Sequence, residues 1–480
     1  MPMSLRCVVM GGVLLASLLF SLPSAAVTLL YFNDAHEIEP VDDGVRGGMA
    51  RLAGVIEAER ARGEHVLVLF GGDLAGGTLF GLMKGEPIVD AFNLIGVDVA
   101  TFGQHDFDHG VAHTRELVAR STFPWITSNL TELDGQPFNQ LPQYKVIEVG
   151  GLRLGFIGLT TAMDTTLGQD EVIEQPVVPA ARAAVRALQA AQVDVVVAIT
   201  QQSVAEDRAL VAAVPEIDLV LGEEMSETVS QLERIGSHYL VRSAGNISSV
   251  VRVELPSADV ADWRLSVAPI DANSPESLEV AHLAAVSSGA LDNKLAEVVR
   301  DIATAQHWSR QTARSERVGL GTQVAESFRQ ALQADIGLIS GGGLRADLNV
   351  QPPALTLREL AAVLPFNNRL VRVRLTVAQL REALEQGLAE YPQAHNQFPQ
   401  WSGLEVVIEW DAPPGIRVRA ISRQGQALSD PDTITLAVTQ FMASGGDGYV
   451  ALREGQIEAT GPLDREAFAT WWASRELDGD

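Results

Sequence analysis

Residues Val27–His36 read VTLLYFNDAH, and this segment decides the fold of the first half of the chain. Positions Val27–Phe32 are apolar or β-branched throughout, without alternation of apolar and polar residues. Such a run is typical of a strand that is covered on both faces. Asn33, Asp34 and His36 follow directly, so the strand is predicted to end in a polar loop.

Two further predicted strands end in loops of the same kind. His65–Phe70 is followed by Gly71-Gly72-Asp73, and Val97–Phe102 is followed by Gly103-Gln104-His105-Asp106-Phe107-Asp108. In a layered α/β domain these loops share one rim of the sheet, where acids and imidazoles converge on metal ions. A single Asp-x-His is usually a turn acid beside a surface histidine. Several successive strands that end in such loops favour a metal site instead.

The rest of the chain extends this pattern into two domains. Short β-branched runs alternate with stretches of helical period, which predicts an α/β layered domain from residue 27 to 273. Residues 274–318 are predicted to form a helical linker, with helices over Glu276–Ala285 and Leu291–Ala305. Beyond it, an amphipathic helix at Leu320–Gln333, a strand at Ile336–Ile339 and a glycine loop indicate a smaller α+β domain, residues 319–480.

Composition narrows the class of partner. The 480 residues include 35 Lys and Arg, 61 Asp and Glu, and one cysteine, so a disulfide scaffold and a disordered tail are excluded. The formal net charge of -26 disfavours binding to nucleic acid and to anionic membranes. An anionic substrate would therefore need a local positive or metallic site.

The first 26 residues have the features of a signal peptide. Arg6 precedes the apolar run Val8–Phe20, and Ser24-Ala25-Ala26 offers small residues for cleavage. The alternative, an uncleaved membrane anchor, is less favoured because the run is short for a bilayer. Cleavage after Ala26 would remove the one cysteine, Cys7. We therefore expect a secreted protein in a periplasm, with no stable membrane anchor after cleavage.

The motifs of both halves together resemble one family, the secreted 5'-nucleotidases. The matching runs are LLYFNDAH at Leu29–His36, Gly71-Gly72-Asp73, GQHDFD at Gly103–Asp108, SGGGLR at Ser340–Arg345, VLPF at Val363–Phe366 and FMASGGDGY at Phe441–Tyr449. The resemblance implies a four-layered α/β/β/α calcineurin-like metallophosphoesterase domain, a helical linker and a C-terminal α+β substrate-recognition domain that rotates relative to the first.

The resemblance also implies roles for residues of the first domain. Asp34 and His36 would bind a first metal ion, and Asp73 would bridge it to a second one. Gln104 occupies the position of the family's asparagine ligand of the second metal. His105 and Asp108 match the family's catalytic dyad, in which Asp108 fixes the imidazole that assists the reaction.

This chain departs from the family at three later positions. Gln201 and Glu224 stand where the family has histidine ligands, and Ser226 replaces a ligand of the first metal. Amide and carboxylate oxygens suit manganese, magnesium or calcium better than zinc. We therefore expect one or two divalent ions, with zinc disfavoured at the second site.

In the second domain, the resemblance assigns substrate contacts. Phe398 and Phe441 would hold a nucleoside between their rings, Asp447 would accept hydrogen bonds from the ribose, and Arg345 would contact the phosphate or leaving group. Phe366 is interpreted as core or pocket wall.

Two functions remain open at this point. The favoured one is a secreted phosphoesterase that hydrolyses nucleotides or a related small phosphate ester with metal-activated water. The alternative is a catalytically silent protein that binds a nucleoside or nucleotide and has lost its second metal site. Retention of His105 and Asp108 favours the enzyme, and loss of the histidine ligands favours the binder. A purely structural role leaves both sets of motifs unexplained.

Overall fold

Strand β1 (Val27–Phe32) lies in the middle of a five-stranded sheet with the order β13-β12-β1-β2-β3. The computed structural model describes residues 26–475 with the exception of 64, 77, 164, 165, 167, 169, 303, 304, 346 and 367. The predicted signal peptide, apart from Ala26, lies outside the described residues. The other strands of this sheet are β2 (Val66–Phe70), β3 (Val99–Ala100), β12 (Ser249–Leu255) and β13 (Arg264–Pro269).

Parallel pairing fixes where the loops of this sheet end. β1 pairs in parallel with β2, and β2 pairs in parallel with β3. Their carboxyl ends therefore lie at the same edge, as the sequence predicts for the loops that follow them. β12 and β13 pair antiparallel on the other side of β1.

A second sheet has six strands in the order β10-β11-β9-β8-β6-β5. Its four middle strands are parallel neighbours, and its two outer strands are antiparallel. The strands are β5 (Tyr144–Val149), β6 (Leu152–Thr160), β8 (Val195–Gln201), β9 (Leu219–Gly222), β10 (Gln231–Ile235) and β11 (His238–Arg242). A short pair, β4 (Leu130–Glu132) and β7 (Val172–Glu174), lies apart from it.

The two sheets pack face to face between two layers of helices. Leu29 and Tyr31 of β1 belong to the apolar core shared with Phe156 of the second sheet, whereas Leu30 and Phe32 belong to a core on the opposite face. This alternation explains why β1 is buried at every position. Helices cover both outer faces: α1 (Met49–Arg62), α2 (Glu86–Ile95), α3 (Val111–Arg120), α4 (Val177–Ala190) and α5 (Val204–Ala213). The predicted α/β/β/α layers are confirmed.

The linker differs from its prediction. One helix, α6 (Leu278–Leu295), packs against α1 and α2 through buried residues that include Val280 and Ala284. The helix predicted over Leu291–Ala305 is wrong beyond Leu295, because β14 (Val298–Asp301) follows; a second strand, β15 (Gln306–Trp308), lies further along the predicted linker. These strands pair with β18 (Ala354–Thr356) and β17 (Leu348–Val350), so pairing with distant partners overrides the local helical pattern.

The second domain is built on a sheet with the order β20-β16-β24-β19-β25. Its strands are β16 (Ile336–Ser340), β19 (Arg369–Thr376), β20 (Pro399–Ser402), β24 (Thr433–Thr439) and β25 (Gln456–Leu463). Its helices are α7 (Gly319–Ala331), α8 (Leu357–Val363), α9 (Val377–Gly387), α10 (Gln440–Ala443) and α11 (Asp464–Ser474). A smaller sheet contains β21 (Glu405–Ile408), β22 (Val418–Arg423) and β23 (Gln426–Ala427). The α+β character predicted for this domain is confirmed.

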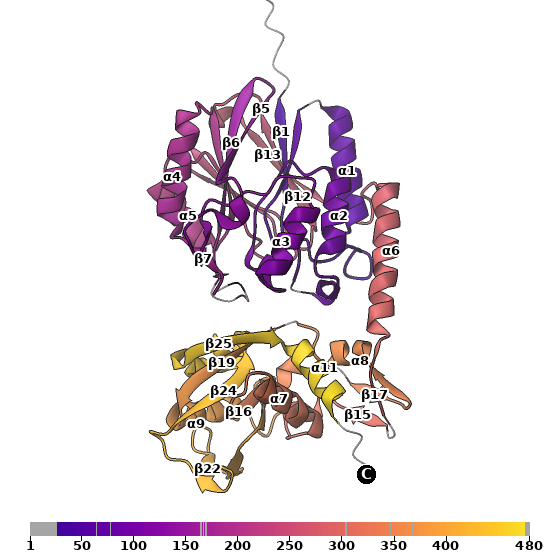
Figure 1. Ribbon diagram of the computed structural model, residues 1–480, viewed down its shortest axis with the longest axis vertical. Helices are drawn as coiled ribbons and strands as arrows, with labels where there is room; N and C mark the ends of the chain where they lie inside the picture. Colours follow the sequence, from indigo (N-terminus) through magenta and orange to yellow (C-terminus); the bar gives the residue numbers. More distant parts are fainter. Residues whose placement is uncertain are drawn as a thin grey trace, which may run out of the picture.

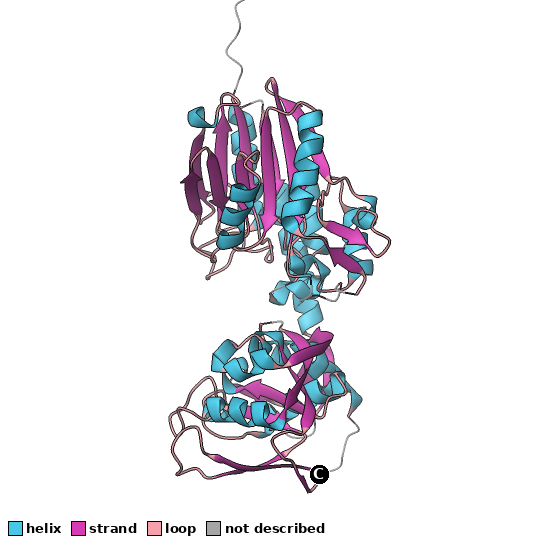
Figure 2. Cartoon of the chain, turned by 90° about the vertical axis from the view of Figure 1, so that its left-hand side faces the viewer, coloured by secondary structure: helices cyan, strands magenta, loops and turns pink. Residues whose placement is uncertain are grey.

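Figure 1 shows the two domains one above the other, joined along one side by α6. β19 and β25 lie on the side of the second domain that faces the first (Figure 1). The turned view in Figure 2 shows the same separation into two bodies. Within the described part of the chain, no helix is both long enough and apolar enough to cross a membrane. The predicted boundaries at residues 273 and 318 stay predictions.

Candidate functional site

The loops after β1 and β2 are joined by their backbones. The amide of Asp34 donates to the carbonyl of Gly72 at 3.1 Å, and the amide of Ala35 donates to the carbonyl of Asp73 at 2.9 Å. Asp34 and Asp73 both have positive φ angles, 51° and 66°, which aspartate tolerates better than most residues. These turns hold both carboxylates at the rim of the sheet.

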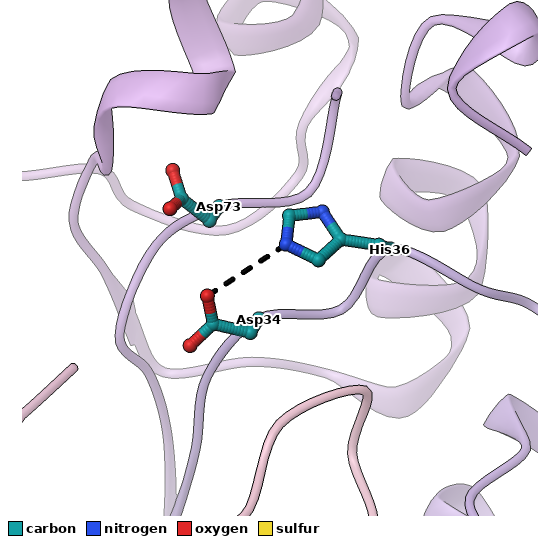
Figure 3. Close-up of side chains that lie close together, drawn as sticks. All are labelled: Asp34, His36 and Asp73. Atoms are coloured by element: carbon teal, nitrogen blue, oxygen red, sulfur yellow. Dashed lines mark ion pairs between the residues drawn. The ribbon is translucent and has the colours of Figure 1, made fainter. Parts of the chain in front are cut away.

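Asp34, His36 and Asp73 form a compact buried group (Figure 3). Each of the three residues offers one possible metal-binding atom, and these atoms all lie within 4.8 Å of one another. Among the described residues, this is the one group of at least three His, Cys, Asp or Glu side chains so arranged. Asp34 Oδ1 lies 3.7 Å from His36 Nε2. Asp34 Oδ2 and His36 Nδ1 are buried without a hydrogen-bond partner. Because buried polar atoms are normally paired, this group has the donor set and the unpaired atoms that a divalent cation would satisfy.

The electrostatics of the group point the same way. Burial raises the pKa of Asp34 to about 7, although the nearby His105 opposes this. Burial also raises the pKa of Asp73 and lowers the pKa of His36 to about 4. His36 is therefore neutral at pH 7, which is the form that binds metal. The two carboxylates would gain most from a cation, since burial disfavours their charge.

Asp106 holds the loop that carries Asp73. Its carboxylate accepts hydrogen bonds from the amides of Gly103 at 2.9 Å, Asp73 at 3.1 Å and Leu74 at 2.9 Å. The approach is close: a Cβ added to Gly103 would lie 2.0 Å from Asp73 Oδ1, so glycine is required there. Asp106 therefore stabilises the loop of the site, a role that the family motif did not assign to it.

His105 and Asp108 lie beside the group and contact each other. His105 Nδ1 and Asp108 Oδ2 are 2.9 Å apart, and the backbone amide of His105 donates to Asp73 Oδ1 at 2.8 Å. Burial by itself lowers the pKa of His105, but the carboxylates of Asp108 and Asp73 raise it to about 10. His105 is therefore a cation at pH 7 whose second ring nitrogen, Nε2, is left for another acceptor.

Arg369 was not singled out by sequence reasoning. It begins β19 in the second domain, and its Nη2 lies 3.2 Å from Asp108 Oδ1 and also donates to the Asp108 carbonyl. Burial raises the pKa of Asp108, but His105 and then Arg369 outweigh this effect and lower it. Arg369 is one of three arginines in the strand sequence RLVRVRLT, so nothing local distinguishes it as a residue that contacts the other domain.

The loops after β8 and β9 form the other half of the rim. Gln201 is buried, its Nε2 donates to the carbonyl of Gly71 at 3.2 Å, and its Oε1 has no partner. The structure therefore brings Gln201 to the loop of Asp73 with an oxygen free. Gln104, at the start of the short 3-10 helix Gln104–Phe107, lines a 690 Å³ pocket together with Gln202 and Glu223.

The carboxylate of Glu224 does not belong to the group of Asp34, His36 and Asp73. Glu224 packs on Gly245, where an added Cβ would lie 1.3 Å from Glu224 Oε2. The hydroxyl of Ser226 accepts from the amides of Thr228 and Val229, so it closes its own turn. Burial, and then repulsion from Asp34, raise the pKa of Glu224 to about 8. A role of either residue as a ligand stays a prediction.

A buried ion pair supports this second half of the rim. Arg242 pairs with Asp207, and it also donates to the backbone carbonyls of Glu223 and Gln202. Asp207 in turn accepts from Thr200 and from Gln202, each at 2.8 Å. The two loops are therefore tied together by an arginine and an aspartate of the protein itself.

The second domain carries a pocket of 370 Å³ with two exposed aromatic rings. Phe366 and Phe441 line it and are 46% and 52% exposed. The guanidinium carbon of Arg345 lies 4.7 Å from the centre of the Phe366 ring, and Asp447 accepts from Ser340 at 2.6 Å. We call this the aromatic pocket. It brings together three of the predicted residues, Arg345, Phe441 and Asp447.

The fourth, Phe398, is not in the aromatic pocket. It is 2% exposed, belongs to the core of the second domain, and stacks at 8° and 6.5 Å on Trp410. Only its backbone meets the glycine loop, because its carbonyl accepts from Gly341 at 2.7 Å. The prediction that Phe398 stacks on a base is therefore corrected: Phe366, interpreted as core or pocket wall, is the exposed ring that lines the pocket with Phe441.

Known proteins resemble this chain over both of its domains. Residues 295–454 match the model of the 5'-nucleotidase C-terminal domain. The trifunctional nucleotide phosphoesterase protein YfkN of Bacillus subtilis is 27% identical over 92% of this chain, which spans 33% of that protein. A snake venom 5'-nucleotidase of Gloydius brevicauda is 25% identical over 94% of this chain and 86% of its own length.

Solved structures share the fold over nearly the whole chain. A 5'-nucleotidase precursor from Thermus thermophilus superposes with a TM-score of 0.62 and 22% identity, covering 93% of this chain and 96% of its own. The NAD nucleotidase NadN of Haemophilus influenzae gives a TM-score of 0.70 at 17% identity, with 93% and 96% covered. The two-domain fold is thus one that experimental structures contain.

Proposed function

We propose that this chain, a member of the 5'-nucleotidase family with a calcineurin-like N-terminal domain, is a metal-dependent phosphoesterase that hydrolyses nucleotides or related small phosphate esters. The observation that carries the proposal is the buried group of Asp34, His36 and Asp73 directly beside the His105–Asp108 pair. Binding alone would need a cation site or a proton donor, but it would not need both at one place.

Asp34, His36 and Asp73 would hold the first divalent ion, and Gln104 and Gln201 would offer amide oxygens to a second; the Gln201 oxygen is buried without a partner. When bound, such an ion supplies Lewis-acid stabilisation of the phosphoryl group. The oxygen-rich donors of the second half favour manganese, magnesium or calcium over zinc. The unpartnered oxygens of Asp34 and Gln201 support this assignment.

His105 would donate a proton or a hydrogen bond to the phosphoryl or leaving-group oxygen. Its Nδ1 faces Asp108, so the proton offered to substrate is the one on Nε2. Asp108 keeps the imidazole positively charged and oriented, and the carboxylate of Asp73 further stabilises this positive charge. These are contributions of the chain's own residues to a reaction in which negative charge develops on phosphate oxygens.

The aromatic pocket would recognise the nucleoside. Phe441 and Phe366 offer exposed ring faces for stacking, which suits any flat base. Asp447 would accept from ribose hydroxyls, and Arg345 would contact the phosphate or the leaving group with its paired nitrogens. The net charge of the chain makes such local donors necessary for an anionic substrate.

Export is part of the proposal. The features of residues 1–26 suggest a cleaved signal peptide and a periplasmic destination, so the substrates would be extracytoplasmic nucleotides. Peptide mapping of the protein from its native envelope fraction tests this, and a chain beginning at Val27 is the expected result. A mature chain that retains Cys7 would contradict cleavage.

A second candidate is favoured by one observation, the replacement of the family's histidine ligands by Gln201 and Glu224. In this alternative the protein binds a nucleoside or nucleotide in the aromatic pocket and does not cleave it. The two candidates differ in turnover, and they agree on binding.

The test is phosphate release from AMP, UDP-glucose and p-nitrophenyl phosphate with manganese, magnesium, calcium or zinc added singly. We expect turnover with at least one ion. Phe441→Ala should raise KM for AMP roughly tenfold, since stacking of one base contributes about 1–3 kcal/mol. KM for p-nitrophenyl phosphate should stay unchanged to within about twofold, because this ester lacks a nucleoside.

A matched control is Phe398→Ala. This ring is buried in the core, so its loss should lower the melting temperature and leave KM for AMP nearly unchanged. Equal effects of Phe441→Ala on both esters would contradict the stacking role.

A further inference from the structure

Arg369 reaches from the second domain to the catalytic pair of the first. Its Nη2 contacts both the Oδ1 and the backbone carbonyl of Asp108, and its Nη1 donates to the carbonyl of Gly461 at 3.1 Å. The side chains of Arg369 and Asp108 are 5% and 8% exposed. A buried ion pair of this kind has few alternative geometries, because moving either partner would leave a charge without water or counterion.

The same carboxylate serves two partners. Asp108 Oδ1 faces Arg369 at 3.2 Å, and Asp108 Oδ2 faces His105 Nδ1 at 2.9 Å. Rotation of the carboxylate about its own bond would therefore break both contacts. Arg369 fixes the plane of the group that fixes the imidazole.

The residue before Arg369 lies at the other half of the site. Asn368 lines the aromatic pocket, its Nδ2 donates to Asp464 Oδ2 at 3.2 Å, and its carbonyl accepts from the Asp464 amide at 2.8 Å. Neighbouring residues of an extended chain point to opposite sides. One short segment thus presents Asn368 to the aromatic pocket and Arg369 to the catalytic pair.

We propose that Arg369 is a positioning residue, which sets the His105–Asp108 pair from the substrate-binding domain and thereby ties the alignment of that pair to one orientation of the two domains. Arg369 acts through Asp108, and it does not contact the reacting atoms. This inference rests on the proposed function for its kinetic test, and it has a second test that needs no turnover.

The kinetic test is a double-mutant cycle. Arg369→Met should lower kcat by about 10- to 100-fold, for AMP and for p-nitrophenyl phosphate alike, because misplacing a catalytic group by an ångström has an effect of this size. In an Asp108→Asn background the same substitution should change kcat by less than about threefold, since the residue through which Arg369 acts is already altered. A merely structural residue would lower activity equally in both backgrounds, and that result would overturn the proposal.

Two further variants separate positioning from folding. Arg369→Lys keeps the charge and should recover part of the lost kcat. Arg417→Met removes an equally buried arginine whose guanidinium donates to the carbonyls of Ala412, Leu388 and Tyr391, all within the second domain. It should lower the melting temperature without the loss of kcat. A loss of kcat in Arg417→Met as large as that in Arg369→Met would overturn the assignment.

The test without turnover measures domain orientation. From Val27 onward the chain has no cysteine, so spin labels can be placed at Leu133→Cys and Val407→Cys, which are 67% and 58% exposed and lie in different domains. We expect a single narrow distance distribution with Arg369 and a broader one in Arg369→Met, but no broadening in Arg417→Met. An unchanged distribution in Arg369→Met would overturn the proposal. Absence of turnover in the unmutated protein would count against the proposed function alone.

Discussion

The two halves of the rim of the first domain use their loops differently. After β1 and β2, Asp34, His36 and Asp73 converge on one point, with two buried atoms left unpaired. After β8 and β9, the loops are held by the chain's own Asp207–Arg242 pair, and Gln201 Oε1 and Glu224 Oε2 are likewise buried without a partner. Each half has a cation of the chain, His105 in the first and Arg242 in the second, but Arg242 also pairs with an acid and joins the two loops of its half.

This difference indicates which of the two halves would need a metal ion to hold its side chains in place. Asp106 accepts from the amides of Gly103, Asp73 and Leu74, and the carboxylate of Asp73 accepts from the amide of His105, so the protein fixes the backbone of the first half and one oxygen of Asp73. In the second half, Arg242 already joins the backbones of Gln202 and Glu223. We therefore expect metal to matter more for the first half than for the second.

Substitution of Asp73 in the first half should have the largest effect on activity. Asp73→Asn should lower kcat/KM by roughly 1000-fold or more, which corresponds to about 4 kcal/mol of transition-state stabilisation. The reason is that Asp73 both belongs to the group that could hold a metal ion and accepts from the amide of His105. Metal content by mass spectrometry and phosphate release measure the two effects.

The control for this variant is Asp98→Asn at the opposite end of the same sheet. Asp98 Oδ2 accepts from the amide of Val68 at 2.8 Å, so the change touches the sheet but not the rim. Activity should remain within about twofold of the unmutated protein. Activity like that of the unmutated protein in Asp73→Asn would remove the metal mechanism.

Introducing histidines into the second half tests whether it can bind a metal ion. Gln201→His together with Glu224→His should raise the affinity for zinc roughly tenfold, since imidazole is a better zinc ligand than an amide or a carboxylate oxygen. Titration calorimetry with zinc measures this. Gln189→His, on the exposed face of α4, is the control and should have no effect. If the double variant gained nothing, Gln201 and Glu224 would not lie at a metal site.

The smallest effect concerns stability without metal. Between pH 6.5 and pH 8, burial keeps protons on Asp34, Glu223 and Glu224, whose pKa values rise to about 7, 7 and 8, and carboxylates keep one on His105, whose pKa rises to about 10. The folded state therefore binds more protons than the unfolded state, so stability falls as pH rises through this window. The lowered pKa of His36, about 4, acts below the window.

Melting temperatures of chelator-treated protein at pH 6.5 and pH 8 test this. We expect a decrease of a few degrees toward pH 8, and a larger stabilisation by manganese at pH 8, where the carboxylates are ionised. A metal-free protein that is more stable at pH 8 would contradict the burial of these groups.

Much of the fold follows from local sequence. The strands of the two sheet centres are apolar without alternation, so Val27–Phe32 is recovered residue for residue. The outer strands β5 and β10 are not recovered, because Lys145, Glu148, Glu233 and Arg234 interrupt them on partly exposed faces. β14 was predicted as helix and β15 as part of the helical linker, because the strands with which they pair lie some distance along the chain.

The candidate site shows the same limit. Asp34, His36 and Asp73 could be found because each follows a strand end within four residues, and His105 and Asp108 because they match the motif of the family that the chain resembles. The burial of Phe398 and the exposure of Phe366 depend on how the second domain packs, which local sequence does not encode. Arg369 could not be found at all, because its role depends on a contact with a residue 261 positions earlier.

The most direct test of the account is metal content and phosphate release measured on the same sample of mature protein, before and after chelation. The account predicts that the purified protein holds at least one divalent ion, that chelation abolishes phosphate release from AMP, and that manganese or magnesium restores it. A protein that holds no ion and releases no phosphate under any added metal, while still binding adenosine, would contradict the account and establish the silent binder instead.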